Sequence, residues 1–314
     1  MMNRYIAHDG HTRTVTALQA DHLEEDAIYV FGPFSEEHRL QQAIWREMLE
    51  ERPAQCVQII EQQQTSMRYR TTVSEASVSL LDNKGLQEIF NRAAVYVDIT
   101  GLNHSVWAAL LRASLLGLEA IFFVYTEPGA YKEHESPSSS SLFDLTATFG
   151  GVSPLPGMAN LSGPDRDVKS VLVPFLGFES ARPKHIALDF DPQPQIMPIV
   201  GLPGFKADYP QITISTNNEF LTDTRAYEQI RYARASCPFE AYSALFEIQR
   251  DNPGCFLHIA PTGTKPHALG AVWYAFDHPR DTEIIYDHPI RKGKRTTGVG
   301  PTHIYYIKPR HADI

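Results

Sequence analysis

The sequence lacks the features that mark several large classes of protein. Its 314 residues contain no run of about 18 apolar residues, so no membrane-spanning helix is expected. The N-terminal Met1–Arg4 has no apolar core of a secretory signal, which makes the cytoplasm the expected location. The three cysteines are scattered and form no C-x-x-C pair. A disulfide framework and a zinc ribbon are therefore excluded.

Positive charge is also scarce. The 28 Lys and Arg residues are outnumbered by 37 Asp and Glu residues, which gives a formal net charge of -9. This balance argues against an extended nucleic-acid surface but leaves room for a local basic pocket. Any anionic ligand must therefore be held locally, and no membrane partner is expected. With 43% hydrophobic residues, the chain can bury a substantial core.

The common catalytic and nucleotide-binding motifs are absent as well. The chain contains no G-x-x-x-x-G-K-[ST] phosphate loop and no G-x-G-x-x-G dinucleotide fingerprint. It also lacks the G-x-S-x-G nucleophile elbow and the H-E-x-x-H zinc motif. No nucleophile stands out, and we expect neither a cofactor nor a metal.

One plan of strand, loop and helix occurs twice. The apolar run Val95–Ile99 leads into a Gly-containing loop and then into a helical pattern. Cys255–Ala260 behaves in the same way, with Pro266 suited to the first turn of the following helix. Further matched strands, such as Ile28–Phe31 with Met197–Val200, lie about half the chain length apart. The alternative is that two generic βα units resemble each other by chance.

This repetition predicts an α/β fold made of tandem duplicated Rossmann-like units with mainly parallel sheets. The first unit is expected over residues 1–132 and the second over 171–314. Residues 133–170 are rich in Ser, Pro and Gly and are expected to form a linker. Ligands of such sheets bind at the carboxyl ends of the strands, where the Gly-containing loops lie.

The loop Thr262–Lys265, with the sequence Thr-Gly-Thr-Lys, is the most informative segment. Glycine allows the backbone to approach a ligand, and the N-terminus of the following helix attracts anions. The lysine adds a full positive charge. We therefore predict an anion or phosphate site whose contact residues are Thr262, Gly263, Thr264, Lys265 and His267. The alternative is a tight turn whose lysine points into solvent.

The stretch Phe256–Ala275 resembles the ligand loop of the CRISPR-associated Rossmann fold (CARF) sensors, in which a Gly-Thr-Lys-type turn follows a strand. The resemblance is local and carries over only to Gly263, Thr264 and Lys265. It departs from the family where Thr262-Gly263 replaces two adjacent glycines. The resemblance implies that the protein binds a ligand of the cyclic oligonucleotide class and acts in prokaryotic antiviral defence.

The equivalent loop of the first copy has no lysine but carries other polar groups. Thr100, Gly101 and Asn103 are expected to contact ligand at a diverged partner site. Asp98 is a candidate to position a metal or act as a base, and His104 is a candidate proton shuttle. The alternative is that these side chains only cap the loop and the helix.

A third group of candidates is basic. Lys292 and Arg295 lie in a glycine-rich loop that is suited to clamp a phosphate chain, beside the catalytic candidate His288. Arg13 and Arg182 each follow a glycine of the first loop of their copy and are expected to bind phosphate. The alternative is that they pair with a carboxylate between domains. A solvated, charged loop is the alternative for the cluster around Lys292.

Three hypotheses of function follow. The first is a CARF-like sensor, or a subunit of a defence system, that passes ligand binding on to a protein partner or to a second copy of itself. The second is an enzyme that processes a phosphoester or nucleotide in the same pocket, with Asp98, His104 or His288 as acid or base. The third is a structural subunit of a larger complex.

Overall fold

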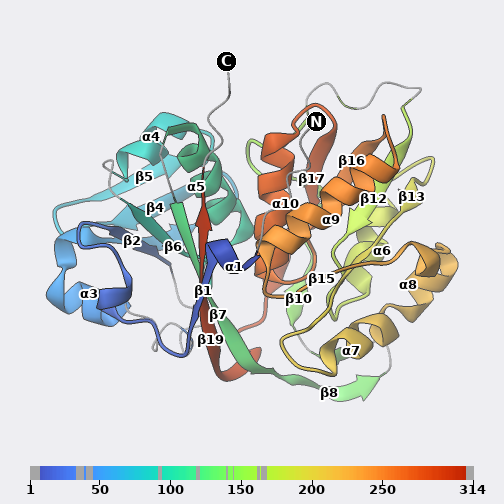
Figure 1. Ribbon diagram of the computed structural model, residues 1–314, viewed down its shortest axis with the longest axis horizontal. Helices are drawn as coiled ribbons and strands as arrows, with labels where there is room; N and C mark the ends of the chain where they lie inside the picture. The colour runs from blue at the N-terminus through green and yellow to red at the C-terminus, as the bar shows by residue number, and fades with distance from the viewer. Residues whose placement is uncertain are drawn as a thin grey trace. The chain divides into compact units, whose positions relative to one another are not determined.

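The computed structural model describes residues 8–32, 39, 45–90, 94–117, 121–138, 141–143, 145–160, 163 and 168–308. Within it the chain forms two compact units (Figure 1). The first unit combines Asp9–Tyr131 with the C-terminal segment that begins at Thr296. The second unit consists of Lys132–Arg295, to which His8 also belongs. From Asp9 onward, the chain thus enters the second unit once and returns to the first.

The first unit is built on an eight-stranded mixed sheet with the order β1-β19-β7-β6-β2-β3-β4-β5. Its strands are β1 (Thr12–Val15), β2 (Ile28–Phe31), β3 (Cys56–Gln62), β4 (Ser66–Arg70), β5 (Glu75–Ser79), β6 (Val95–Asp98), β7 (Ile121–Tyr131) and β19 (Thr296–Ile307). The four central strands β7, β6, β2 and β3 are parallel, and the flanking strands are antiparallel.

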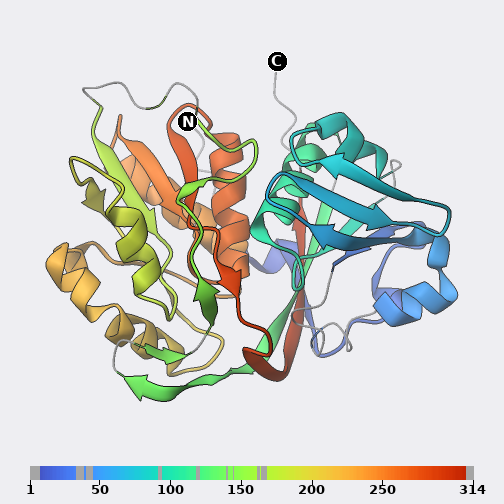
Figure 2. The same cartoon turned by 180° about the vertical axis from the view of Figure 1, so that it is seen from behind.

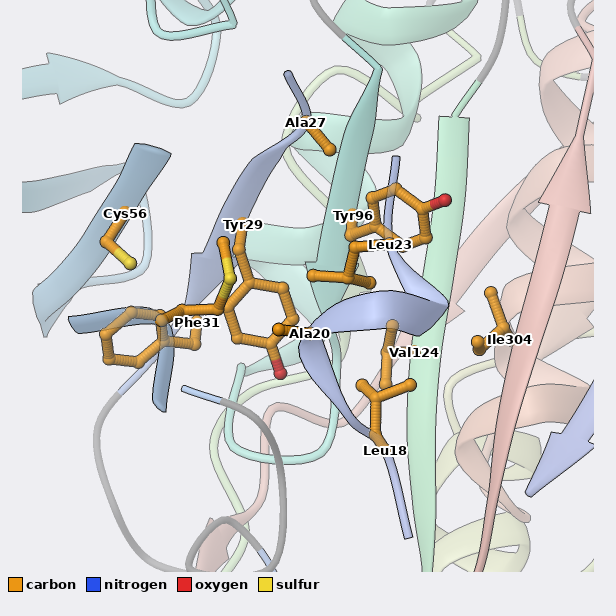
Figure 3. Close-up of a cluster of buried hydrophobic side chains, with 11 residues drawn as sticks. Leu18, Ala20, Leu23, Ala27, Tyr29, Phe31, Cys56, Tyr96, Val124 and Ile304 are labelled. Atoms are coloured by element: carbon orange, nitrogen blue, oxygen red, sulfur yellow. The ribbon is translucent and has the colours of Figure 1, made fainter. Parts of the chain in front are cut away.

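Helices connect these strands and cover both faces of the sheet. They are α1 (His8–His11), η1 (Ala20–His22), α3 (Trp45–Glu51), η2 (Pro53–Gln55), α4 (Asn83–Glu88) and α5 (His104–Gly117). β3 and β7 lie on opposite sides of the β2–β6 pair, so right-handed crossovers place α3 and α5 on opposite faces. On the α3 face, Tyr29, Val124 and Ile304 of the sheet pack with Leu18 and Leu23 (Figure 3).

The second unit carries a largely parallel sheet of five strands with the order β11-β17-β16-β12-β13. A bridge from Phe175 to Ile199 joins a further parallel pair, β14 and β15, to β12. The strands are β8 (Glu133–Ser138), β9 (Ser141–Phe143), β10 (Thr146–Thr148), β11 (Ser153–Pro154), β12 (Ser170–Pro174), β13 (Gln195–Ile196), β14 (Ile199–Gly201), β15 (Arg231–Ala233), β16 (Phe256–Ala260), β17 (Thr282–Tyr286) and β18 (Ile290–Arg291). The parallel order β15-β14-β12-β16-β17 is the 3-2-1-4-5 order of doubly wound sheets.

The helices of this unit are α6 (Ala181–Ala187), α7 (Tyr209–Thr216), α8 (Asn218–Asp223), η3 (Tyr227–Gln229), α9 (Pro238–Asp251) and α10 (Lys265–Asp277). α9 and α10 pack side by side on one face of the sheet (Figure 1). On the other face, seen in Figure 2, Ile186 of α6 packs with Leu172, Ala260 and Ile285 of the strands. Thr264 and Cys237 cap α10 and α9, and each helix has a proline in its first turn.

The α/β class predicted from the sequence is confirmed, but the expected tandem duplication is not shown. The sequence offsets matched Ile28–Phe31 (β2) with Met197–Val200, the region of β14. The same offsets matched β6 with β16. In the structure β2 pairs directly with β6, but their predicted counterparts β14 and β16 are separated by β12. The Ser-rich stretch 133–170 holds the short strands β8 to β11. No helix in the described ranges is long and apolar enough to cross a membrane.

Candidate functional site

The strongest candidate site lies at the carboxyl ends of β12 and β16, where the strand order of the second unit reverses. Open α/β sheets bind ligands at this position, because the loops leave for opposite faces and open a crevice. Here the loops touch at two glycines. A Cβ atom added to Gly263 would lie 3.2 Å from the carbonyl oxygens of Phe175 and Leu176, and one added to Gly177 would lie 3.1 Å from that of Thr262. Close backbone contact thus requires glycine in both loops.

The first turn of α10 forms one wall of this site. The Thr264 hydroxyl accepts a hydrogen bond from the backbone N–H of His267 (3.3 Å) and donates one to the carbonyl of Ala235 (2.6 Å). This cap fixes the helix start against the end of β15. Lys265 is the first helical residue and is half-buried. Lys265 therefore belongs to the turn at which the positive end of the helix dipole lies.

A buried ion pair beneath the loops braces them. The Arg182 guanidinium donates two hydrogen bonds to the Asp287 carboxylate (2.8 and 2.6 Å) and one to the carbonyl of Thr262 (2.8 Å). Burial opposes ionisation of Asp287, but Arg182 outweighs it and holds the pKa of that carboxyl below its usual range. Arg182 is only 1% exposed and offers almost no surface to a ligand. Together with Thr262, whose hydroxyl donates to Phe175, it holds the loops in place.

His267 is also a structural group. Its side chain is 1% exposed, and its Nε2 lies 3.2 and 3.0 Å from the carbonyl oxygens of Ala233 and Arg234. Burial lowers the pKa of His267 to about 4, although the two carbonyls act in the opposite direction. The ring is therefore neutral near pH 7 and donates from Nε2. It ties α10 to the end of β15 and supplies no charge to an anion.

A cavity of about 510 Å³ adjoins the loop after β12. Its walls combine aromatic rings with charge: Phe143, Phe149, Phe178, Glu179, Lys184 and Lys292 are among the lining residues. The Phe143 and Phe178 rings lie 4.6 Å apart, and the Lys184 ammonium forms an ion pair with Glu219 (2.6 Å). Of the basic residues predicted from the sequence, Lys292 thus lies in this cavity.

The sequence analysis missed Phe143 and Phe149, because it assigned their segment to a linker. The available signal was the apolar alternation of Phe143 and Leu145 within a Ser-rich stretch. It also missed the link from Arg291 to Glu179 and Thr146, whose oxygens each lie 3.1 Å from its Nη1. Burial lowers the pKa of Arg291. This link ties β18 to β10 and to the loop that follows β12.

The remaining candidates of this loop have local roles. The His288 Nε2 is 2.9 Å from the Ser153 hydroxyl, and burial lowers the pKa of this histidine. Arg295 is half-buried, and its backbone carbonyl accepts a hydrogen bond from the N–H of Lys132 (2.8 Å). Neither contact by itself assigns a chemical step.

The predicted partner-site residues lie in the first unit. Asp98 is fully buried and accepts hydrogen bonds from the Tyr29 hydroxyl and the Thr100 N–H, both at 2.9 Å. Burial and the nearby Asp98 charge raise the pKa of Tyr29. The Thr100 hydroxyl in turn accepts from the N–H of Thr126 (3.0 Å). Asp98 and Thr100 therefore stabilise the strand ends.

The other three residues of that loop differ in exposure. Gly101 is buried, and His104, the first residue of α5, is 6% exposed. Asn103 is exposed, and its backbone N–H donates to the Gln62 side chain (2.6 Å). Arg13 is exposed on β1 and lines a separate cavity of about 230 Å³. The sequence-predicted residues thus fall into two groups, one in each unit.

Neither metal geometry nor similarity to known proteins identifies the site. Within the described segments, no group of three or more His, Cys, Asp or Glu side chains is arranged to hold a metal ion. No protein-family model matches the chain, and no curated protein matches it.

Proposed function

We propose that the second unit binds a nucleotide-derived anion at the carboxyl ends of β12 and β16, beside the first turn of α10. The observation that carries this proposal is the position of Lys265. It opens a 13-residue helix at the point where the strand order reverses. A lysine and a helix dipole coincide there, and both favour phosphate.

Electrostatics support a local site in an acidic protein. The net charge of -9 disfavours long-range attraction of polyanions. Arg182 is neutralised by Asp287, and Lys184 by Glu219. Lys265 lies at the N-terminus of α10, and the proposal places the phosphate there.

The cavity beside the loop after β12 is large enough for a ligand bigger than phosphate; the described part of its lining includes Phe178 and Glu179 of that loop and no residue of the turn around Lys265. Pockets of about 300–1,000 Å³ hold drug-sized molecules, and this cavity has about 510 Å³. The local resemblance to CARF sensors extends the proposal to the cyclic oligonucleotide class. In that case the protein is a sensor or subunit in antiviral defence, whose bound state is recognised by a partner protein or by a second copy of the chain.

The test is calorimetry with a panel of cyclic and linear oligonucleotides on wild type and on Lys265→Ala. Loss of one charge-assisted contact is worth about 1.5–3 kcal/mol, so affinity should fall about 10- to 150-fold. The matched control is Lys169→Ala, an exposed lysine just before β12 at the amino end of the same sheet. Equal affinities of wild type and Lys265→Ala would remove Lys265 from the site.

The same samples separate sensor from enzyme. Chromatography of the ligand after incubation should recover it unchanged if the protein only senses it. Linear or shortened products would support the enzyme hypothesis instead. Failure of every tested oligonucleotide to bind, with both proteins folded, would count against the nucleotide class itself.

A further inference from the structure

Three polar side chains form a connected row at the amino ends of the second unit's strands, away from the proposed anion site. They are Ser170 of β12, His258 of β16 and Glu283 of β17, three adjacent parallel strands. The His258 Nδ1 lies 2.7 Å from a Glu283 carboxylate oxygen, and its Nε2 lies 3.2 Å from the Ser170 hydroxyl. The row therefore links a hydroxyl to an imidazole and the imidazole to a carboxylate.

With an ionised carboxylate and a neutral imidazole, one histidine tautomer satisfies both contacts. An ionised carboxylate only accepts hydrogen bonds, so Nδ1 carries the proton and donates to Glu283. In neutral imidazole the other nitrogen then has a lone pair, and Nε2 accepts from the Ser170 hydroxyl. This is the assignment in which histidine takes a proton from a serine nucleophile while a carboxylate orients the ring.

The surroundings hold the imidazole in this orientation. His258 is 5% exposed, and its ring lies 4.8 Å from that of Phe190 and 4.9 Å from that of Phe256. These apolar neighbours lower the local dielectric, which strengthens the interaction with Glu283. Ser170, at the end of the row, is half-buried and retains some exposed surface.

Strand pairing alone does not explain the Ser170 contact. In the first unit Thr14 and His303 also share a hydrogen bond (2.9 Å), but they are directly opposite each other in the antiparallel register. Ser170 instead pairs with Phe256, and the residue opposite His258 is Leu172. Ser170 therefore reaches His258 along a diagonal of the sheet.

We propose that Ser170 is a nucleophile for acyl transfer, with His258 as its base and Glu283 as a positioning residue. The substrate class is a carboxylic ester with a small apolar acyl group, which Phe190 would accommodate. The Ser170 oxygen bonds to the ester carbonyl carbon while its proton passes to His258 Nε2. The tetrahedral adduct collapses, and the departing alkoxide takes that proton and leaves as the alcohol. Water then attacks the acyl-serine with His258 again as base, releasing the carboxylic acid.

The first test uses diisopropyl fluorophosphate on the full-length protein, followed by peptide mass mapping. The expected product is one diisopropylphosphoryl group on Ser170 with release of fluoride, and its absence in Ser170→Ala. Thr14→Ala is the matched control and should be labelled like wild type. If Ser170→Ala does not fold, the peptide map of labelled wild type still identifies the site. A folded wild type that is not modified at Ser170 overturns the proposal.

The second test examines Glu283 through hydrolysis of p-nitrophenyl acetate. Glu283→Gln should lower kcat by about 10²- to 10⁴-fold and leave KM unchanged, since Glu283 acts through His258 and does not touch the ester. Equal kcat in wild type and folded Glu283→Gln overturns the role of Glu283. These results do not depend on anion binding, so they test the acyl-transfer proposal independently of the function proposed above.

Discussion

At the scale of single residues, this protein buries several polar groups and directs them to fixed partners. Arg182 is the clearest case, because its guanidinium reaches Asp287 on one side and the Thr262 carbonyl on the other. Removing one partner of such a pair leaves an unpaired buried charge, which is strongly destabilising. These residues therefore hold in place the loops that surround the proposed anion site.

His267 leads to a pH-dependent prediction at the same scale. Its pKa is lowered from 6.5 to about 4 in the folded protein, so the unfolded chain takes up the proton first as the pH falls. The stability associated with neutral His267 is complete above about pH 6.5 and is lost as the pH falls toward 4. The shift corresponds to about 3 kcal/mol.

The measurement is the free energy of unfolding by urea for wild type and His267→Gln at several pH values. Glutamine retains an N–H donor for the carbonyls of Ala233 and Arg234 but does not titrate. The advantage of wild type over the variant should therefore shrink by about 3 kcal/mol between neutral pH and pH 4. A difference that is constant across this range would contradict the assignment.

At the scale of elements, the second unit depends on the close packing of α9 and α10. A Cβ atom on Gly270 of α10 would lie 2.1 Å from the carbonyl oxygen of Pro238 and 2.9 Å from the Cβ of Ala241. The first of these atoms belongs to the backbone of α9 and has little freedom to move. Glycine at this position therefore permits the two helices to approach.

Gly270→Ala should consequently destabilise the protein although alanine favours helix. The gain in helix propensity from glycine to alanine is at most about 1 kcal/mol. We expect the cost of overpacking to outweigh this gain, so that the free energy of unfolding falls by about 1–3 kcal/mol. Gly151→Ala is the control, since an added Cβ there meets no atom within 4 Å. Denaturant unfolding of both variants provides the measurement, and equal stabilities would argue against close packing at Gly270.

At the scale of the whole molecule, β19 gives the first unit two of its strand pairings. It pairs with β7 along most of its length, and β1 pairs with its other edge. Truncation after Arg295 removes this strand, leaving β1 without its partner and one edge of β7 exposed. The first unit should then lose its cooperative structure, while the second unit keeps its sheet.

Hydrogen exchange of the truncated chain measures this directly. Amides of β6 and β7 should lose protection, and amides of β12 and β16 should retain it. A truncation after Lys308, which keeps β19, is the control and should leave both patterns unchanged. Loss of protection in β16 with retention in β7 would show that the C-terminal segment stabilises the second unit instead.

The sequence by itself determined features that depend on neighbouring residues. The apolar runs Val95–Ile99 and Cys255–Ala260 predicted two of the buried parallel strands, β6 and β16, and the Thr-Gly-Thr-Lys turn predicted the start of α10. Such signals act within three or four residues, because hydrophobic periodicity and helix capping are local. The α/β class and the position of Lys265 at a helix N-terminus followed from them.

Only the tertiary structure decided which distant residues meet. It pairs Arg182 with Asp287, brings Ser170 to His258, places the aromatic residues of the 133–170 stretch at a cavity, and returns β19 to the first unit. Each outcome joins segments separated by tens to hundreds of residues, for which a single sequence carries no local signal. Burial and the need to satisfy every buried polar group select these partners, and both act only once the chain is packed.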